Sequence, residues 1–179
     1  MAYKTPGVYV KEISTLPPSV AQVETAIPAF LGYTEKATDE NGNAIADDDE
    51  IYTARIKSYP EFVERFGNAP QAPFNVSISA TGEVSVADPG LTFRMNYALQ
   101  MYFANGGGPC YICSVKRYGN VVPAITLTDF YDLGNPDGLD AISKEDEPTI
   151  LVFPDMPGLS ANDANELGKQ ALVQCANLG

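Results

Sequence analysis

The sequence predicts an α/β protein, of mixed α+β character, in which strand–helix units surround a mixed sheet and an extended arm precedes the core. Apolar strand-like segments alternate with amphipathic helical segments along most of the chain. Hydrophobic residues make up 45% of the 179 residues and charged residues 19%, which is enough apolar surface for a packed core. The third observation is a strand-like stretch, 8–13, set apart at the N-terminus between proline-containing breakers. We therefore divide the chain into an arm, 1–18, and a core, 19–179.

The arm contains a strand-forming stretch with no obvious partner. Pro6-Gly7 precedes this stretch and Pro17-Pro18 follows it. The N–H and C=O groups of a strand must pair somewhere, so the arm is expected to add to the edge of a neighbouring subunit's sheet or to the sheet of its own chain. The residues predicted to form this contact are Pro6, Gly7, Val8, Tyr9, Val10, Lys11, Glu12 and Ile13.

The first half of the core reads as two strands, a short helix and a hairpin. An apolar run at 27–33 is typical of a buried strand, and the acidic stretch 38–50 is typical of a solvated loop or hairpin tip. Residues 51–57 read as a strand. Alternating valine and isoleucine residues predict a hairpin over 74–87, within an inserted region at about 70–90.

A capping box marks the start of the short helix that follows residue 57. Ser58 is the expected N-cap, Pro60 lies in the first turn, and Glu61 stands three residues after the cap. Gly67 is the expected end of this helix.

The second half of the core predicts a helix over 91–105, a strand over 110–117, one helical turn at 139–142, a strand over 149–153 and a final helix to about 176. The apolar run of the last strand is typical of a parallel strand covered on both faces. The final helix has Ser160 as its expected cap. Its predicted buried stripe is Ala164, Leu167, Ala171, Leu172 and Cys175. Because no strand follows this helix, we expect either an N-terminal piece of a longer protein or a partner that supplies the missing strand.

No constellation of residues predicts catalysis, a metal site or a cofactor. The chain has no histidine, and Cys110 and Cys113 lie three apart on a predicted strand, so they face opposite sides and are expected to be buried structural residues. The glycines at 106–108 follow a helix and precede a strand, which favours a simple turn over a phosphate loop. Asp155 follows a strand, where α/β enzymes place ligands, but it is expected to cap the turn before the final helix. The acidic run 47–50 lacks the spacing of an EF-hand loop.

The net charge of −12 makes nucleic acid and anionic membranes unfavourable partners. No apolar run has the length of a transmembrane helix, and the first residues lack the pattern of a signal peptide. We therefore expect synthesis in the cytoplasm and no membrane insertion.

Four stretches, in this order along the chain, resemble the tail sheath family of contractile phage tails and extracellular contractile injection systems. They are TPGVYVKEI, then TAIPAFLGYTEKA, then KSYPEFVERFG with the later LQMYFANGGGPCYICSVKR, and finally LDAISKEDEPTILVFPD. The chain departs from the family at Cys110 and Cys113, where family members usually have hydroxyl or aliphatic residues, and it lacks the family's C-terminal interlocking region.

The resemblance implies the N-terminal part of a sheath subunit, which is not an enzyme and needs no cofactor. It implies that the arm adds a strand to a neighbouring copy, and that the inner tube, baseplate and tail-terminator proteins are further partners. The particle would be a phage virion or an extracellular injection particle. The alternative from the residues is a standalone flavodoxin-like domain that binds or converts a small molecule near Asp155 and the glycines at 106–108. A third possibility is another tail component, such as a tube or terminator protein.

Overall fold

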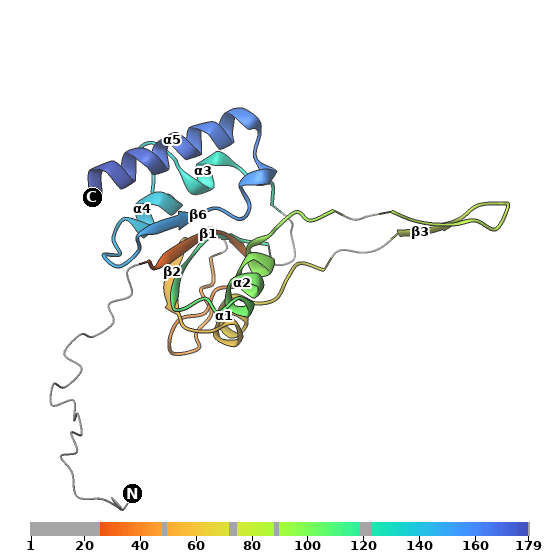
Figure 1. The fold of residues 1–179 in the computed structure, drawn as a ribbon, viewed down its shortest axis with the longest axis horizontal. Helices are drawn as coiled ribbons and strands as arrows, with labels where there is room; N and C mark the ends of the chain where they lie inside the picture. The colour runs from red at the N-terminus through yellow and green to blue at the C-terminus, as the bar shows by residue number, and fades with distance from the viewer. Residues whose placement is uncertain (1–25, 48–49, 72–74, 88–89, 119–122, 179) are drawn as a thin grey trace, which may run out of the picture.

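The computed structural model describes residues 26–47, 50–71, 75–87, 90–118 and 123–178, and it is a mixed α/β fold, as predicted. The centre is a four-stranded sheet in the order β2-β5-β1-β6 (Figure 1). Strand β1 (Pro28–Thr34) runs parallel to β5 (Cys110–Arg117) on one side and to β6 (Ile150–Val152) on the other. Strand β2 (Tyr52–Ile56) pairs with β5 in the antiparallel direction.

Helices cover both faces of this sheet. Helices α1 (Tyr59–Phe66) and α2 (Met95–Ala104) pack against one face, around side chains such as Phe30 and Ile112. On the opposite face lie α3 (Leu127–Phe130), α4 (Gly138–Ile142) and α5 (Ala161–Leu178), with the short 3-10 helix η1 (Met156–Gly158) before α5 (Figure 1). All seven residues of β1 are buried, because the strand has neighbours on both edges and helices on both faces.

The two cysteines of strand β5 confirm the predicted alternation. Cys110 packs in the apolar cluster below α1 and α2, whereas Cys113 packs in the cluster below α4 and α5. Both are fully buried free thiols, and burial raises the pKa of each to about 12. Such thiols are structural, because the reactive thiolate form is suppressed.

The third cysteine provides a test of this packing. Cys175 is exposed, so the native protein should react rapidly with a thiol reagent at one site per chain, and at all three sites only after denaturation. Counting modified thiols by mass spectrometry, with and without denaturant, checks the result. Rapid modification of Cys110 or Cys113 in the native protein would contradict the packing of β5.

Helix α1 begins and ends where the sequence predicts. The Ser58 hydroxyl accepts the Glu61 N–H at 3.3 Å, and the Glu61 carboxylate accepts the Lys57 N–H at 2.8 Å, one residue before the usual partner in a capping box. Gly67 ends the helix with φ of +90°, a conformation that favours glycine.

Helix α2 begins at Met95, so the prediction of a helix from residue 91 was wrong. Phe93 is buried in the cluster on one face of the sheet and stacks on Tyr118, with ring centroids 4.7 Å apart. Met95 is buried in the cluster on the other face. The chain therefore crosses from one layer to the other at 93–95, directly before the helix begins, and Leu91 remains 52% exposed.

Two predictions about the C-terminal third were also wrong. Strand β6 is an edge strand, with Ile150 47% exposed, and not a strand covered on both faces. In α5 only Leu167 and Ala171 are buried, whereas Leu172 is 72% exposed. Leu172 lies about 100° around the helix from Ala171, which turns it away from the core. Cys175 lies one turn beyond Ala171 and is also exposed.

The predicted hairpin is present as β3 (Asn75–Ile78) and β4 (Val84–Ala87). Gly82, with φ of +82°, lies in its turn. The hairpin projects away from the sheet in Figure 1, and every described residue of it is exposed. The predicted arm, 1–18, lies outside the described residues.

Candidate functional site

The carboxyl ends of the parallel strands are the usual ligand position of α/β proteins, and Asp155 lies there with no exposed surface. Its carboxylate accepts the Tyr33 N–H at 2.9 Å and the Arg94 N–H at 2.5 Å. Burial raises the pKa of Asp155, although these backbone donors oppose the shift. Asp155 therefore joins the end of β1 to the start of α2. The prediction that its side chain caps the turn before α5 was wrong.

Gly32 allows the close approach of this carboxylate. A Cβ atom at position 32 would lie 2.5 Å from an Asp155 oxygen. Sequence reasoning missed the role of Gly32 as the point where Asp155 approaches β1. A glycine inside a buried apolar strand is the sequence signal that indicates such a close approach.

Three further polar side chains near this end of the sheet have hydrogen-bond partners within the chain. The Tyr33 hydroxyl donates to Asp129 at 2.5 Å and accepts the Thr126 N–H at 3.1 Å. Burial raises the pKa of the Tyr33 hydroxyl above its usual value. Tyr118 donates to the Asn68 carbonyl at 2.6 Å. Arg117 donates to the carbonyls of Asp47 and Glu50. Tyr33, Tyr118 and Arg117 are therefore held by hydrogen bonds within the chain.

The glycines at 106–108 form the predicted helix-to-strand turn. Gly106 has φ of +84°, and the Gly107 N–H donates to the Tyr102 carbonyl at 2.9 Å, which closes the last turn of α2. A Cβ atom at position 107 would overlap the Tyr102 ring. The glycines therefore serve the fold.

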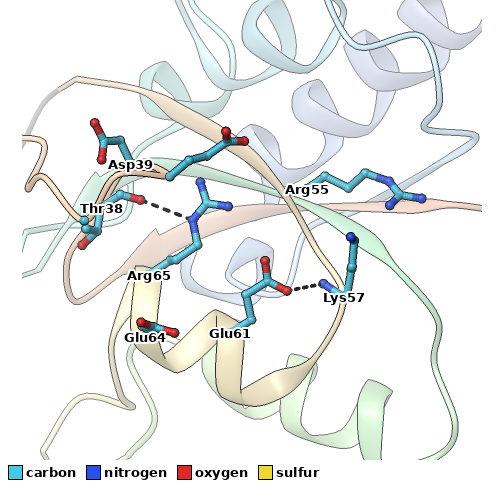
Figure 2. A pocket seen from close by; sticks show the side chains of 9 residues that line it. Thr38, Asp39, Arg55, Lys57, Glu61, Glu64 and Arg65 are labelled. Atoms are coloured by element: carbon cyan, nitrogen blue, oxygen red, sulfur yellow. Dashed lines mark hydrogen bonds between the residues drawn. The ribbon is translucent and has the colours of Figure 1, made fainter.

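A charged pocket of about 520 Å³ lies between the turn at 38–44, strand β2 and helix α1 (Figure 2). Arg65 reaches toward that turn, donates to the Thr38 carbonyl and the Tyr52 hydroxyl, and lies 5.9 Å from the Tyr52 ring centroid. The pocket is lined by Thr38, Asp39, Glu40, Gly42, Arg55, Lys57, Glu61, Glu64 and Arg65. The pocket therefore carries both acidic and basic side chains.

Several of these charges already have partners within the chain. Arg55 forms an ion pair with Glu147 at 2.8 Å. Asp39 accepts hydrogen bonds from Asn41 and Asn43, and those from Asn43 lower its pKa most. The sequence did not reveal the pocket, because its residues come from three separate segments and follow no single spacing.

The structure places two further surfaces where another chain has room to bind. The outer edge of β6 has no strand beside it among the described residues. Next to this edge, a groove of about 360 Å³ lies between β6, α4 and the end of α5. Ile27 and Thr149 join the start of β1 to the start of β6 through two hydrogen bonds, of 2.9 and 3.1 Å. The predicted arm residues, 6–13, lie outside the described residues, so their contacts stay a prediction.

Comparisons with known proteins do not assign this chain to a family. No protein-family model matches the sequence, and no curated protein matches it either. In the described parts of the chain, no cluster of three or more His, Cys, Asp or Glu side chains is arranged to hold a metal ion. Within the same residues, none of the helices combines the length and apolar character needed to cross a membrane.

Proposed function

We propose that this chain is a structural subunit of a contractile tail sheath, which polymerises around an inner tube and contracts to drive that tube through a target cell envelope. Its partners are then neighbouring copies of itself, the inner tube protein, and baseplate and tail-terminator proteins. The subunit assembles in the cytoplasm and becomes part of a phage virion or an extracellular contractile injection particle. The four ordered stretches that resemble sheath proteins are the first support for this proposal.

The observation that carries the proposal is the outer edge of β6, which has no neighbouring strand among the described residues. Thr149 bonds to Ile27 on the opposite, paired edge of β6, so the described core begins one strand away from this open edge. Residues 14–25 separate the strand-forming stretch from the described core, and an extended chain covers about 3.3 Å per residue, or roughly 40 Å in all. In the proposed sheath, this segment carries residues 8–13 out to the sheet of an adjacent subunit, where they add a strand.

The core suits a subunit that moves as one body. Apolar clusters on both faces of the sheet tie the helices to it, so a change in the packing between subunits costs less than a change within one. In the proposed mechanism, triggering lets each subunit rotate and bury more surface against its neighbours. That difference in free energy drives the tube, and the sheath consumes no nucleotide.

The alternative, a flavodoxin-like domain that binds or converts a small molecule, receives less support. Its two candidate features were Asp155 and the glycines at 106–108. The first is buried and bonded to backbone N–H groups, and the second closes a helix. A ligand would have to displace contacts that hold the fold together.

Electron microscopy of the full-length protein, expressed alone at high concentration, tests the proposed function. We expect long hollow cylinders with a cogwheel-like end view, because sheath subunits assemble by pairing with one another. Single rings that do not stack would instead support a tube or terminator protein. Monomers or dimers at all concentrations would contradict the proposal and make a search for a small ligand the next step.

A further inference from the structure

The groove beside β6 is an apolar surface that none of the described residues covers. Ile150 and Leu178 on its walls are 47% and 64% exposed. The groove is lined by Ile142, Glu145, Asp146, Pro148, Thr149, Ile150, Leu151, Gln174, Cys175 and Leu178. Burial of apolar side chains of this size is favourable, so the groove suits a further apolar segment of chain.

The described part of the chain begins next to this groove. Ile27 donates its N–H to the Thr149 hydroxyl and accepts the Thr149 N–H, and Thr149 lines the groove. The Ile27 side chain is buried in the same apolar cluster as Ile142, another groove residue. Figure 1 shows the start of β1 beside the connection from α4 to β6. Residues 1–25 therefore join the described core at this position.

The other undescribed stretches of the chain do not provide a cover. None of them is longer than four residues, and they are 48–49, 72–74, 88–89, 119–122 and 179. Arg117, at the end of β5 farthest from Ile27, bonds to the residues on both sides of 48–49 and is close in sequence to 119–122. The stretches 72–74 and 88–89 flank the hairpin, which lies at the opposite end of the long axis from the C-terminal end of α5 (Figure 1). Within this chain, the segment before β1 has both the length and the position.

The sequence before β1 also has a suitable composition. Residues 14–25 contain a single charged residue, Glu24. Val23 and Val20 stand four and seven positions before Ile27, so they can continue the apolar contact of the Ile27 side chain into the groove. An extended chain covers about 3.3 Å per residue, which gives Val20 a reach of roughly 23 Å from Ile27.

We propose that residues 19–25 lie in the groove beside β6 of their own copy, with Val20 and Val23 against Ile150 and Leu151. Their short connection to Ile27 gives them a high effective concentration at the groove, so a modest apolar contact is enough to hold them there. The same segment of a second copy has no such advantage, because two chains of net charge −12 repel each other. The contact does not draw on charge attraction, and it leaves the exposed Cys175 on the α5 wall open to small reagents.

This contact goes beyond the proposed sheath function and does not depend on it. In a sheath, it would fix the point from which the arm leaves the core. Pro17 and Pro18 directly precede the docked residues, and consecutive prolines form a stiff spacer. The arms of all copies would then leave their cores in the same direction.

Disulfide formation within the full chain tests the contact, because Cys175 lines the groove and the other two cysteines are buried. Val23→Cys places a thiol at a docked position. Gln22→Cys, the neighbouring position whose side chain points elsewhere, is the matched control. Under mild oxidation we expect Val23→Cys to bond to Cys175 about tenfold faster than the control, because a disulfide needs Cα atoms within about 7 Å and Cβ atoms that point toward each other. Peptide mapping identifies the bond, and its rate should not depend on protein concentration.

Two substitutions on α5 add a second comparison. Leu178→Asp places a charge on the wall of the groove and should slow the reaction of Val23→Cys to the rate of the Gln22→Cys control. Leu172→Asp makes the same change at a position that is 72% exposed and outside the groove, so it should leave the rate unchanged.

The other outcomes have distinct meanings. Equal rates for Val23→Cys and Gln22→Cys, or no disulfide in either, would show that residues 19–25 do not occupy the groove. A disulfide between two copies, formed faster at higher concentration, would place a neighbour's segment there and would also overturn the proposal. Micrographs of the same samples separate the two proposals. Cylinders without the specific disulfide would keep the sheath and reject the docked segment, whereas the disulfide without cylinders would keep the docked segment and reject the sheath.

Discussion

Deleting residues 1–18 should leave a folded core and abolish the formation of cylinders. Both apolar clusters and the four strands of the central sheet are formed by described residues of the core, so we expect the core to fold without residues 1–18. The polymer does depend on it, because in the proposed sheath the arm supplies the strand that joins one subunit to the next. Thermal unfolding followed by circular dichroism should change little, while electron microscopy should show dispersed subunits.

Two single substitutions make the same test without a deletion. Val10→Pro removes a backbone N–H from the predicted strand, which blocks pairing at that position. Leu16→Pro introduces the same residue directly before Pro17 and Pro18, outside the predicted strand, and is the matched control. We expect cylinders from Leu16→Pro and none from Val10→Pro.

Two experimental results would contradict the arm hypothesis. Normal cylinders from the deleted protein would show that residues 1–18 are not needed for assembly. A large fall in the unfolding temperature of the deleted protein would instead show that the arm pairs with the sheet of its own chain.

Asp155→Asn should reduce the free energy of unfolding by about 2–3 kcal/mol. Asp155 has no exposed surface, and its two oxygens accept the N–H groups of Tyr33 and Arg94. The amide nitrogen of asparagine cannot accept a hydrogen bond, so one buried donor would lose its partner. Asp146→Asn makes the same chemical change on the surface and should change stability by less than about 0.5 kcal/mol. Urea unfolding of the two variants measures the difference.

The effect of Asp155→Asn should also depend on pH. Burial raises the pKa of Asp155 in the folded protein above its ordinary value of 3.8, so the folded state binds this proton more tightly than the unfolded chain does. The resulting stabilisation is complete below pH 3.8 and is lost as the pH rises through the raised pKa. The stability gap between the wild type and Asp155→Asn should therefore narrow as the pH rises. A gap that widens with rising pH would show that the backbone donors outweigh burial.

The sequence predicted those elements whose limits depend on neighbouring residues. Strand β5 begins directly after Pro109 and alternates between two apolar layers, and α1 lies between a serine cap and a glycine. The hairpin follows from its own alternation and turn. Each of these signals lies within a few residues of the element that it defines.

The predictions that failed depend on distant parts of the chain. The start of α2 is set by Asp155, sixty-one positions away, and by the burial of Phe93 in the opposite layer. Whether β6 has one neighbour or two depends on sheet order, which no local pattern encodes. The same reason explains why the charged pocket and the groove beside β6 were not predicted, since each is assembled from separate segments.

The pairing of β1 has a consequence for how the chain folds during synthesis. Its partners lie at 110–117 and 150–152, and the shortest connection in the sheet joins Ile56 to Cys110. Pairings so distant in sequence make folding slow. The apolar stretch PAFLGYT therefore leaves the ribosome long before either neighbour exists, and it must be kept from aggregating until then. The central sheet is complete only when β6, in the last third of the chain, has been translated.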